Sequence, residues 1–348
     1  MNSNALTNND RIKALQQIGY SEPEAGFLCL AALHGGYFLR RQFAHFLGRQ
    51  DGGTVTQLTQ KVLAQGHVRT STWRQNTQLY HLCARPFYGA LGQGDNRNRR
   101  PREVPAVKNK VMALDFVLAH RQAHYLATER EKLDYFIGHL QLDLAALPSK
   151  GYQSTASGAT TTRYFVDKYP IFVTSKTQEG ATPLTSFCFV DEGLVSLSRF
   201  ETYLTQYGPL FESLSTFHLV YVAADRTHFS GARTMFERYL TRGSSGSNGR
   251  GSDREIERLL AYFKARRLYE QQQFASFDRS QLIGLREARD EFSRPDHEAL
   301  YAKWQATCDG AIREILAPKR ASADPVRGTF STYFLEHDYG LFGSTTPR

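Results

Sequence analysis

Three short apolar segments, each followed by glycine, restrict the fold of this chain more than any other feature. Ser21 and Glu24 have the spacing of a capping box, so the first segment should begin a helix at Glu22. Glycine adopts the left-handed backbone that ends helices, and it recurs after each segment. The pattern therefore predicts three short helices rather than one long one, over 22–34, 38–47 and 55–65.

The third of these helices should have one apolar side. Thr54 is expected to cap its beginning, and Gly66 ends it. The helical repeat turns four apolar side chains toward the domain interior, namely Val55, Leu58, Val62 and Leu63. The same repeat turns five polar residues toward solvent, namely Thr56, Gln57, Thr59, Gln60 and Lys61.

Two strands, over 67–73 and 78–82, should follow around a turn at 74–77. The whole pattern over 22–91 resembles the winged helix-turn-helix family. In that family the third helix enters the major groove, and the hairpin, called the wing, contacts the DNA backbone or the minor groove. The resemblance implies binding of double-stranded DNA, with these candidate contact residues: Arg40, Arg41, Thr56, Gln57, Thr59, Gln60, Lys61, Arg69 and Arg74.

The excess of positive charge is confined to the N-terminal part of the chain, residues 1–110. Residues 1–110 hold 15 Lys and Arg against 6 Asp and Glu, whereas residues 111–348 hold 28 of each sign. A local positive field attracts phosphate backbones and makes binding salt-dependent. The charge therefore favours DNA over the two alternatives, a merely solubilising surface and a winged helix that binds protein.

The segment 92–106 reads as a basic linker because glycine, asparagine and proline surround four arginines. Two interpretations stay open for it. It either follows a phosphate backbone or is a solvated connector. Arg99 and Arg100 are counted among the candidate DNA contacts on the first interpretation.

A second domain of mixed type is expected over 107–242. The pattern predicts a helix, three strands, a helix, a strand and a helix, which is the core order of restriction-endonuclease-like folds. The fold class is therefore α/β in the broad sense, or α+β, with a mixed sheet. The predicted segments are 107–125, 163–166, 170–173, 186–190, 197–214, 217–223 and 232–240.

Beyond this domain the composition changes. Residues 243–252 read GSSGSNGRGS and predict a flexible loop. A helical extension with an aromatic tail should occupy 253–348, and the tail at 330–335 either adds a strand or docks on a protein partner.

A nuclease of this core order needs carboxylates on neighbouring strands and a lysine to activate water. Asp167, Asp191 and Glu192 are the candidate carboxylates, but the lysine of the motif is missing. No catalytic residue, metal ligand or cofactor is assigned on this evidence. Asp167 should precede the strand at 170–173, whereas Asp191, Glu192 and Gly193 are expected to end a strand and turn the chain.

Two longer stretches carry a second resemblance. FCFVDEGLVSLSRFETYLTQYGPLF and HLVYVAADRTHFSGARTMFERYL are similar to the replication-relaxation family of plasmids and conjugative elements. Asp191, Gly193, Tyr207 and Arg226 match its motifs, whereas Phe189 replaces an acid and Leu194 a threonine. The resemblance implies DNA handling on a mobile element, and the two replacements argue against catalysis.

The remaining expectations concern compartment and partners. The four cysteines stand apart, no leader pattern is present, and no apolar run approaches the length of a membrane span. We therefore expect a cytoplasmic protein with no membrane contact. The leading interpretation is a DNA-binding regulator, or a replication or mobilisation accessory, that forms a homodimer and has a possible protein partner for its C-terminal domain. The alternatives are a metal-dependent nuclease or nickase and a winged-helix adaptor for proteins.

Overall fold

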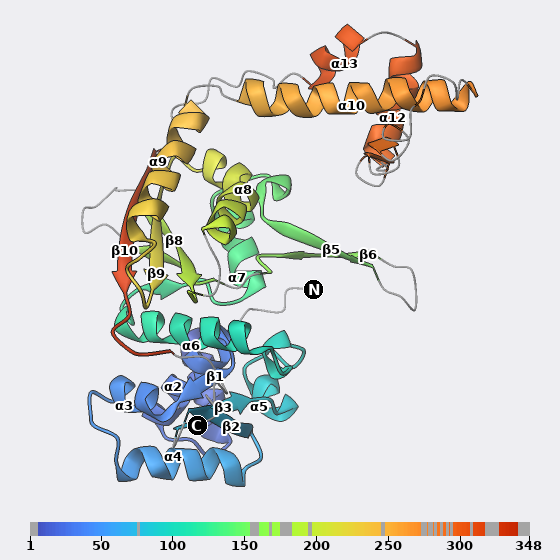
Figure 1. Cartoon of the computed structure of the whole chain (residues 1–348). Helices are drawn as coiled ribbons and strands as arrows, with labels where there is room; N and C mark the ends of the chain where they lie inside the picture. Colours follow the sequence, from blue (N-terminus) through green and yellow to red (C-terminus); the bar gives the residue numbers. More distant parts are fainter. Residues whose placement is uncertain are drawn as a thin grey trace, which may run out of the picture. The chain divides into compact units, whose positions relative to one another are not determined.

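The computed structural model describes residues 6–74, 77–153, 160–166, 169–174, 183–193, 197–244, 248–272, 295–306, 309–316 and 327–339, with single positions between 277 and 292. The described chain is a mixed α/β structure (Figure 1). It divides into two compact units, Met1–Glu237 with Arg327–Arg348, and Arg238–Val326. The expected class, helices combined with a mixed sheet, is therefore confirmed. No helix among the described residues is long and apolar enough to cross a membrane.

The first unit begins with a helical module that carries a small sheet, here called the N-terminal module (residues 6–103). Its strands pair antiparallel in the order β1, β3, β2. Its elements are α1 (Asn8–Gln17), α2 (Glu22–His34), β1 (Tyr37–Leu39), α3 (Arg40–Phe46), α4 (Gly53–Ala64), β2 (Val68–Arg74), β3 (Thr77–Leu82), α5 (Arg85–Ala90) and the 3-10 turn η1 (Arg97–Arg99).

The predicted capping box is confirmed at the start of α2. The backbone N–H of Ser21 donates to the Glu24 carboxylate at 2.8 Å, which satisfies a donor that the helix itself leaves open. The helix ends at His34, and Gly35 follows with φ +158°. A Cβ at Gly35 would lie 2.8 Å from the Lys110 side chain, so this position also needs glycine for close packing.

Three local predictions for this module are wrong. Residues 37–39 form a strand rather than a helix start, because they pair with Leu79–His81 of β3. Helix α4 begins at Gly53 with Gly52 as its N-cap, so Thr54 lies inside the helix and does not cap it. Leu63 is 43% exposed, because it lies on the flank of α4 and not on its buried side.

Aromatic packing around α2 forms the core of the module. The Phe27 ring is fully buried and lies 5.3 Å from Phe38 of β1 and 5.0 Å from Phe43 of α3. Phe38 in turn stacks on Tyr80 of β3 at 5.1 Å. Each buried aromatic ring contributes a large apolar area, and such pairs add about 0.5–1.5 kcal/mol beyond burial. This cluster fixes the sheet and α3 against α2.

The rest of the first unit is built on a five-stranded mixed sheet within the described residues, in the order β10, β9, β8, β7, β4. Strands β8, β9 and β10 are parallel, and β7 and β4 are antiparallel to their neighbours. Its elements are α6 (Val104–Ala119), β4 (His124–Tyr125), α7 (Glu129–Leu133), the π-helical turn η2 (Asp134–His139), the 3-10 turn η3 (Leu144–Ala146), β7 (Ile171–Thr174), β8 (Leu184–Asp191), α8 (Ser198–Ser213), β9 (Thr216–Ala223), α9 (Phe229–Ser244) and β10 (Arg327–Phe334).

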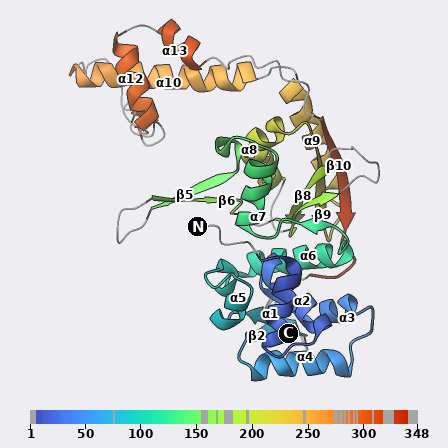
Figure 2. The same cartoon turned by 180° about the vertical axis from the view of Figure 1, so that it is seen from behind.

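Helix α6 lies between this sheet and the N-terminal module in both views (Figures 1 and 2). It contacts α2, α3 and β1 on one side and β8 on the other. Residues 111–118 are buried without interruption, because the helix is covered on both sides.

A separate two-stranded hairpin, β5 (Ser149–Gln153) with β6 (Thr160–Tyr164), projects from this unit (Figure 1). The sequence placed a strand at 163–166 in the main sheet. That placement is wrong, because the strand there pairs with β5 only.

The aromatic tail does add a strand, one of the two fates expected for it. β10 pairs parallel with β9 over its whole length, from Arg327 opposite Thr216 to Phe334 opposite Ala223. A segment more than a hundred residues away in sequence therefore completes one edge of the sheet.

The second unit contains α10 (Asn248–Glu270), α12 (Pro295–Ala306) and α13 (Asp309–Leu316). It has its own core, in which Phe263 contacts Tyr301 and Trp304 at ring distances of 5.2 and 5.8 Å. The loop expected over 243–252 is largely helical where it is described. Helix α9 continues to Ser244 and α10 begins at Asn248, whereas residues 245–247 lie outside the described residues.

One buried carboxylate joins three distant parts of the first unit. Asp115 of α6 is 5% exposed and accepts two hydrogen bonds of 2.7 Å from the Arg41 guanidinium of α3. The Tyr339 hydroxyl, just beyond β10, donates to it at 2.5 Å. Burial and the Asp115 charge raise the pKa of Tyr339, so the phenol keeps the proton that it donates.

We predict that Asp115→Ala lowers the free energy of unfolding by roughly 3 kcal/mol. Removing one partner of a buried pair costs about 3–5 kcal/mol, and the 30% exposure of Arg41 reduces this. Asp51→Ala, which breaks the more exposed pair with Arg40, is the matched control and should cost under about 1 kcal/mol. Urea denaturation measures both, and equal losses would contradict the structural role of Asp115.

A second prediction concerns acid stability. Burial, with Lys132 and Lys110 nearby, lowers the pKa of His34 to about 3. Between about pH 6.5 and 3 the unfolded chain binds a proton here that the folded chain does not, so stability falls as the pH falls. His34→Phe should reduce the pH slope of the unfolding free energy by up to about 1.4 kcal/mol per pH unit in that window. Parallel curves for wild type and variant would refute this.

Candidate nucleic-acid interface

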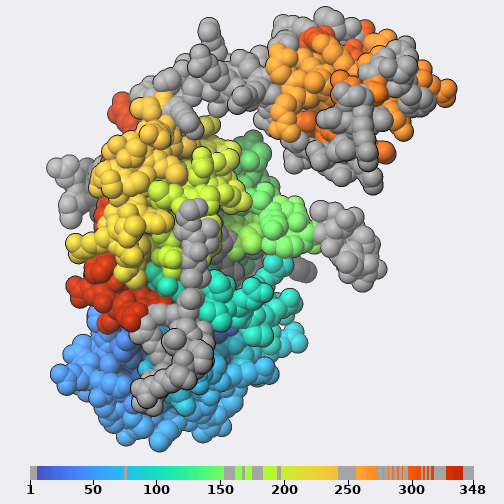
Figure 3. Space-filling view, in the orientation of Figure 1, coloured from blue at the N-terminus to red at the C-terminus, as the bar shows by residue number. Residues whose placement is uncertain are grey.

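The outward face of α4 is the clearest candidate surface. Gly53, Gln57, Gln60 and Ala64 recur at helical spacing and are exposed, whereas Val55, Leu58 and Val62 on the opposite side are buried. The helix lies on the side of the N-terminal module away from α6 (Figures 1 and 2). In the space-filling view the blue side chains of this module form the lower end of the unit (Figure 3). The exposed face is uncharged and offers two amides.

Thr59 is not part of this face, which corrects the sequence prediction. It is 3% exposed, and its hydroxyl donates to the Thr56 carbonyl at 2.9 Å and accepts from Arg40 at 3.2 Å. Thr56 is half-buried and accepts from the same guanidinium at 2.9 Å. The two threonines therefore position Arg40 and leave the outward surface to Gln57 and Gln60.

Arg40 also binds partners within the N-terminal module. Its guanidinium makes two hydrogen bonds to Asp51, of 2.7 and 3.1 Å, in the turn before α4. Hydrogen bonding to Asp51 raises the pKa of Arg40. The contact joins the start of α3 to α4 and sets how the two helices meet. Arg40 is therefore a positioning residue, about one third exposed, and not a freely extended phosphate ligand.

Lys61 and Arg41 also have partners within the chain. The Lys61 ammonium lies 2.6 Å from the Glu24 carboxylate of α2. Burial alone would raise the pKa of Glu24, but hydrogen bonds from Lys61 and Ser21 outweigh it and hold that pKa below its usual value. Arg41 faces α6, where Asp115 holds it, so the structure places it away from the α4 surface.

The hairpin supplies an exposed positive charge next to α4. Arg69 of β2 is exposed, and residues 70–72 beside it are exposed as well. Arg74 ends β2, but its side chain lies outside the described part, as do residues 75 and 76 at the turn.

The basic linker is packed rather than loose. Asn98 is 3% exposed, and its amide donates to the Ala32 carbonyl of α2 at 2.9 Å. Arg99 donates to the carbonyls of Cys83 and Gly94 at 3.3 and 2.7 Å. Only Arg100 of the two predicted contact residues is therefore exposed. Sequence reasoning missed Asn98, which holds the linker on the module, because a lone asparagine among arginines carries no signal of burial.

The carboxylates considered for a nuclease are engaged in structural contacts where they are described. Asp191, at the end of β8, accepts from the Tyr221 hydroxyl at 2.6 Å and from the Gly193 N–H at 2.8 Å. Glu192 is buried, accepts from Asn109 at 3.3 Å and pairs with Arg199. Asp167 lies outside the described residues.

Asp191 and Glu192 line a cleft of about 470 Å³ at the carboxyl ends of β8, β9 and β10. Asp225, Glu336 and Asp338 line it as well. Within the described residues, no three His, Cys, Asp or Glu side chains are grouped so that they could hold a metal ion.

Comparison of the chain with protein-family models, with curated proteins and with solved structures gave no match.

Proposed function

We propose that this protein binds double-stranded DNA through a winged helix-turn-helix made of α2, α3, α4 and the β2–β3 hairpin. The observation that carries the proposal is the outward face of α4, where Gln57 and Gln60 stand exposed on a helix whose other side is buried. The three helices and the strand order β1, β3, β2 support the assignment as a winged helix. The excess of positive charge in residues 1–110 supports DNA as the ligand.

The proposal assigns base recognition and phosphate contact to two different surfaces. Glutamine amides pair with adenine edges in the major groove, so Gln57 and Gln60 are assigned to base reading. Arg69 on the hairpin and Arg100 on the linker are assigned to phosphates. Arg40, Thr56 and Thr59 orient α4 from behind, and Lys61 lies at its margin with Glu24 as its partner.

For the remainder of the first unit we propose a restriction-endonuclease-like core. Its support is the main sheet and the helices next to its strands in sequence. In chain order these are helix α6, the antiparallel strands β4, β7 and β8, helix α8 and strand β9, which is parallel to β8. The segment from α7 to β6 lies between β4 and β7 in the chain. With this core we propose a role as a regulator, or as a replication or mobilisation accessory of a mobile element, acting as a homodimer. Sequencing the DNA fragments that the protein retains in cells would test that role.

We predict that Gln57→Ala and Gln60→Ala reduce discrimination between the preferred duplex and a random one. Each amide pair with a base is worth about 1–3 kcal/mol of discrimination, and none of this is gained on random DNA. Arg69→Ala should instead weaken both duplexes alike and reduce the slope of log K against log salt by about 0.9.

Titrations of both duplexes at several salt concentrations measure these effects. Gln122→Ala, an exposed glutamine beyond α6, is the matched control and should change nothing. Equal weakening of both duplexes by the α4 variants would remove α4 from the recognition role.

A fourth prediction tests the nuclease alternative. Asp191→Ala should leave duplex binding unchanged, while loss of the acceptor for Tyr221 lowers the unfolding free energy by about 1–2 kcal/mol. Binding titrations and urea curves measure the two effects. Magnesium-dependent cleavage by the wild type that disappears in this variant would overturn the prediction and favour a nuclease.

A further inference from the structure

A basic cleft of about 530 Å³ opens beside the N-terminal module, formed by residues other than those of α4. Its walls come from the segment 92–98 after α5, from the beginning of α6, from the start of α7 and from the hairpin β5–β6. All these segments belong to the first unit. The cleft is thus built by elements that are distant in sequence, and none of its lining residues is assigned to the proposed DNA contact.

The lining of this cleft carries an excess of positive charge. Among the described residues, two acids line it, Asp95 and Glu129. Glu129 accepts from the Tyr164 N–H at 2.9 Å and pairs with Arg163 at 3.5 Å, and Asp95 faces Arg85 at 3.6 Å. Against these two stand five basic residues: Arg97, Arg102, Lys110, Lys132 and Arg163.

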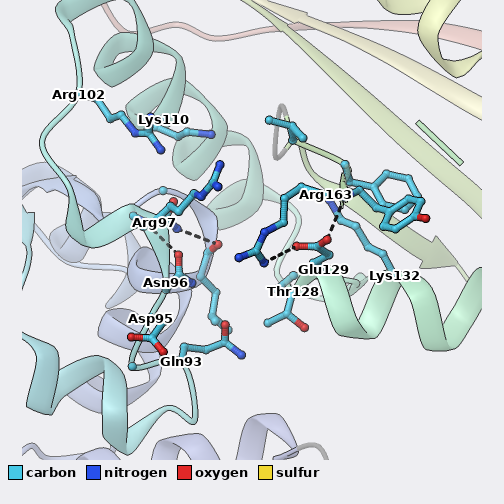
Figure 4. A pocket seen from close by; sticks show the side chains of 18 of the residues that line it. Gln93, Asp95, Asn96, Arg97, Arg102, Lys110, Thr128, Glu129, Lys132 and Arg163 are labelled. Carbon is cyan, nitrogen blue, oxygen red and sulfur yellow. Dashed lines mark hydrogen bonds and ion pairs between the residues drawn. The ribbon is translucent and has the colours of Figure 1, made fainter. Parts of the chain in front are cut away.

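The basic side chains enter one space from three directions. Figure 4 shows Arg97 of η1, Lys110 of α6 and Arg163 of β6 reaching into the same region. The Arg97 guanidinium lies 4.8 Å from the centre of the Tyr152 ring of β5, and this contact holds it at the wall. Like charges that converge in this way repel each other, so the arrangement favours an anion between them.

The size and lining of the cleft restrict the anion. Its volume lies in the range of small-ligand sites, and a DNA duplex is too wide to enter it. Arginine binds phosphate through paired N–H groups, which suits Arg97 and Arg102. Tyr152 and Tyr164 also line the cleft, and tyrosine rings beside basic side chains are the combination that binds unpaired nucleotides.

We propose that this cleft binds a nucleotide unit through its phosphate, either a free nucleotide or one nucleotide of a single strand. The site is additional to duplex binding by α4 and does not depend on it. The phosphate lies among Arg97, Arg102 and Lys110, and the base lies toward the β5–β6 hairpin.

The test uses the full-length protein and three probes: inorganic phosphate, thymidine 5′-monophosphate and a short oligothymidylate. Binding is measured by calorimetry at low salt for wild type and for the double variant Arg97→Gln with Arg102→Gln. The double variant should weaken nucleotide binding at least about tenfold, since charge-assisted hydrogen bonds are lost. Arg238→Gln, an exposed arginine of α9 that neither lines the cleft nor has a role in the proposed duplex contact, is the control and should change binding less than about twofold.

Binding of the mononucleotide that is lost in the double variant identifies a free nucleotide as ligand. Binding of the oligonucleotide alone, lost in the same variant, identifies a single strand. Phosphate binding as tight as the nucleotide, equal weakening by Arg238→Gln, or no saturable binding of any probe overturns the proposal. Duplex titration of the same proteins separates this site from α4, because Gln57→Ala should leave all three probes unaffected.

Discussion

The first unit depends on the pairing of one buried anion, Asp115. A carboxylate taken out of water costs several kcal/mol unless charged or hydrogen-bonding partners replace the lost solvent. Arg41 and Tyr339 provide this replacement from positions 74 and 224 residues away in the chain. The N-terminal module, α6 and the segment after β10 therefore meet at one point, and the position of each is coupled to the presence of the other two.

Helix α3 transmits this constraint to the proposed DNA-binding face. Its first two residues, Arg40 and Arg41, are neighbours in sequence but contact opposite sides of the module. Arg40 reaches forward to Asp51 and α4, whereas Arg41 reaches back to Asp115 and α6. A short helix with charged contacts at both sides is a stiff connection, so α4 is held in a fixed direction relative to α6. Base reading needs such a fixed direction, because amide hydrogen bonds tolerate little misplacement.

The sequence predicted those elements that interactions between near neighbours in the chain determine. The capping box at Ser21 placed the start of α2, and alternation placed the two strands of the hairpin. Contacts between residues distant in sequence determine the features that the sequence did not predict. The three residues of β1 form a strand only because β3 pairs with them, and the helical repeat could not show that Thr59 turns inward to Arg40. The basic cleft was missed for the same reason, since its cations lie on separate segments whose meeting no spacing reveals.

The edge strand β10 returns to the sheet only after the whole second unit, Arg238–Val326, has been traversed. The second unit is therefore an insertion in the chain of the first, which begins within α9 at Arg238 and ends just before β10. During synthesis on the ribosome, β9 emerges with one side unpaired, and Asp115 emerges without the Tyr339 hydroxyl. The inserted unit has its own aromatic core and can fold while the sheet of the first unit still lacks β10. The sheet of the first unit can therefore be completed only after the whole second unit has been synthesised.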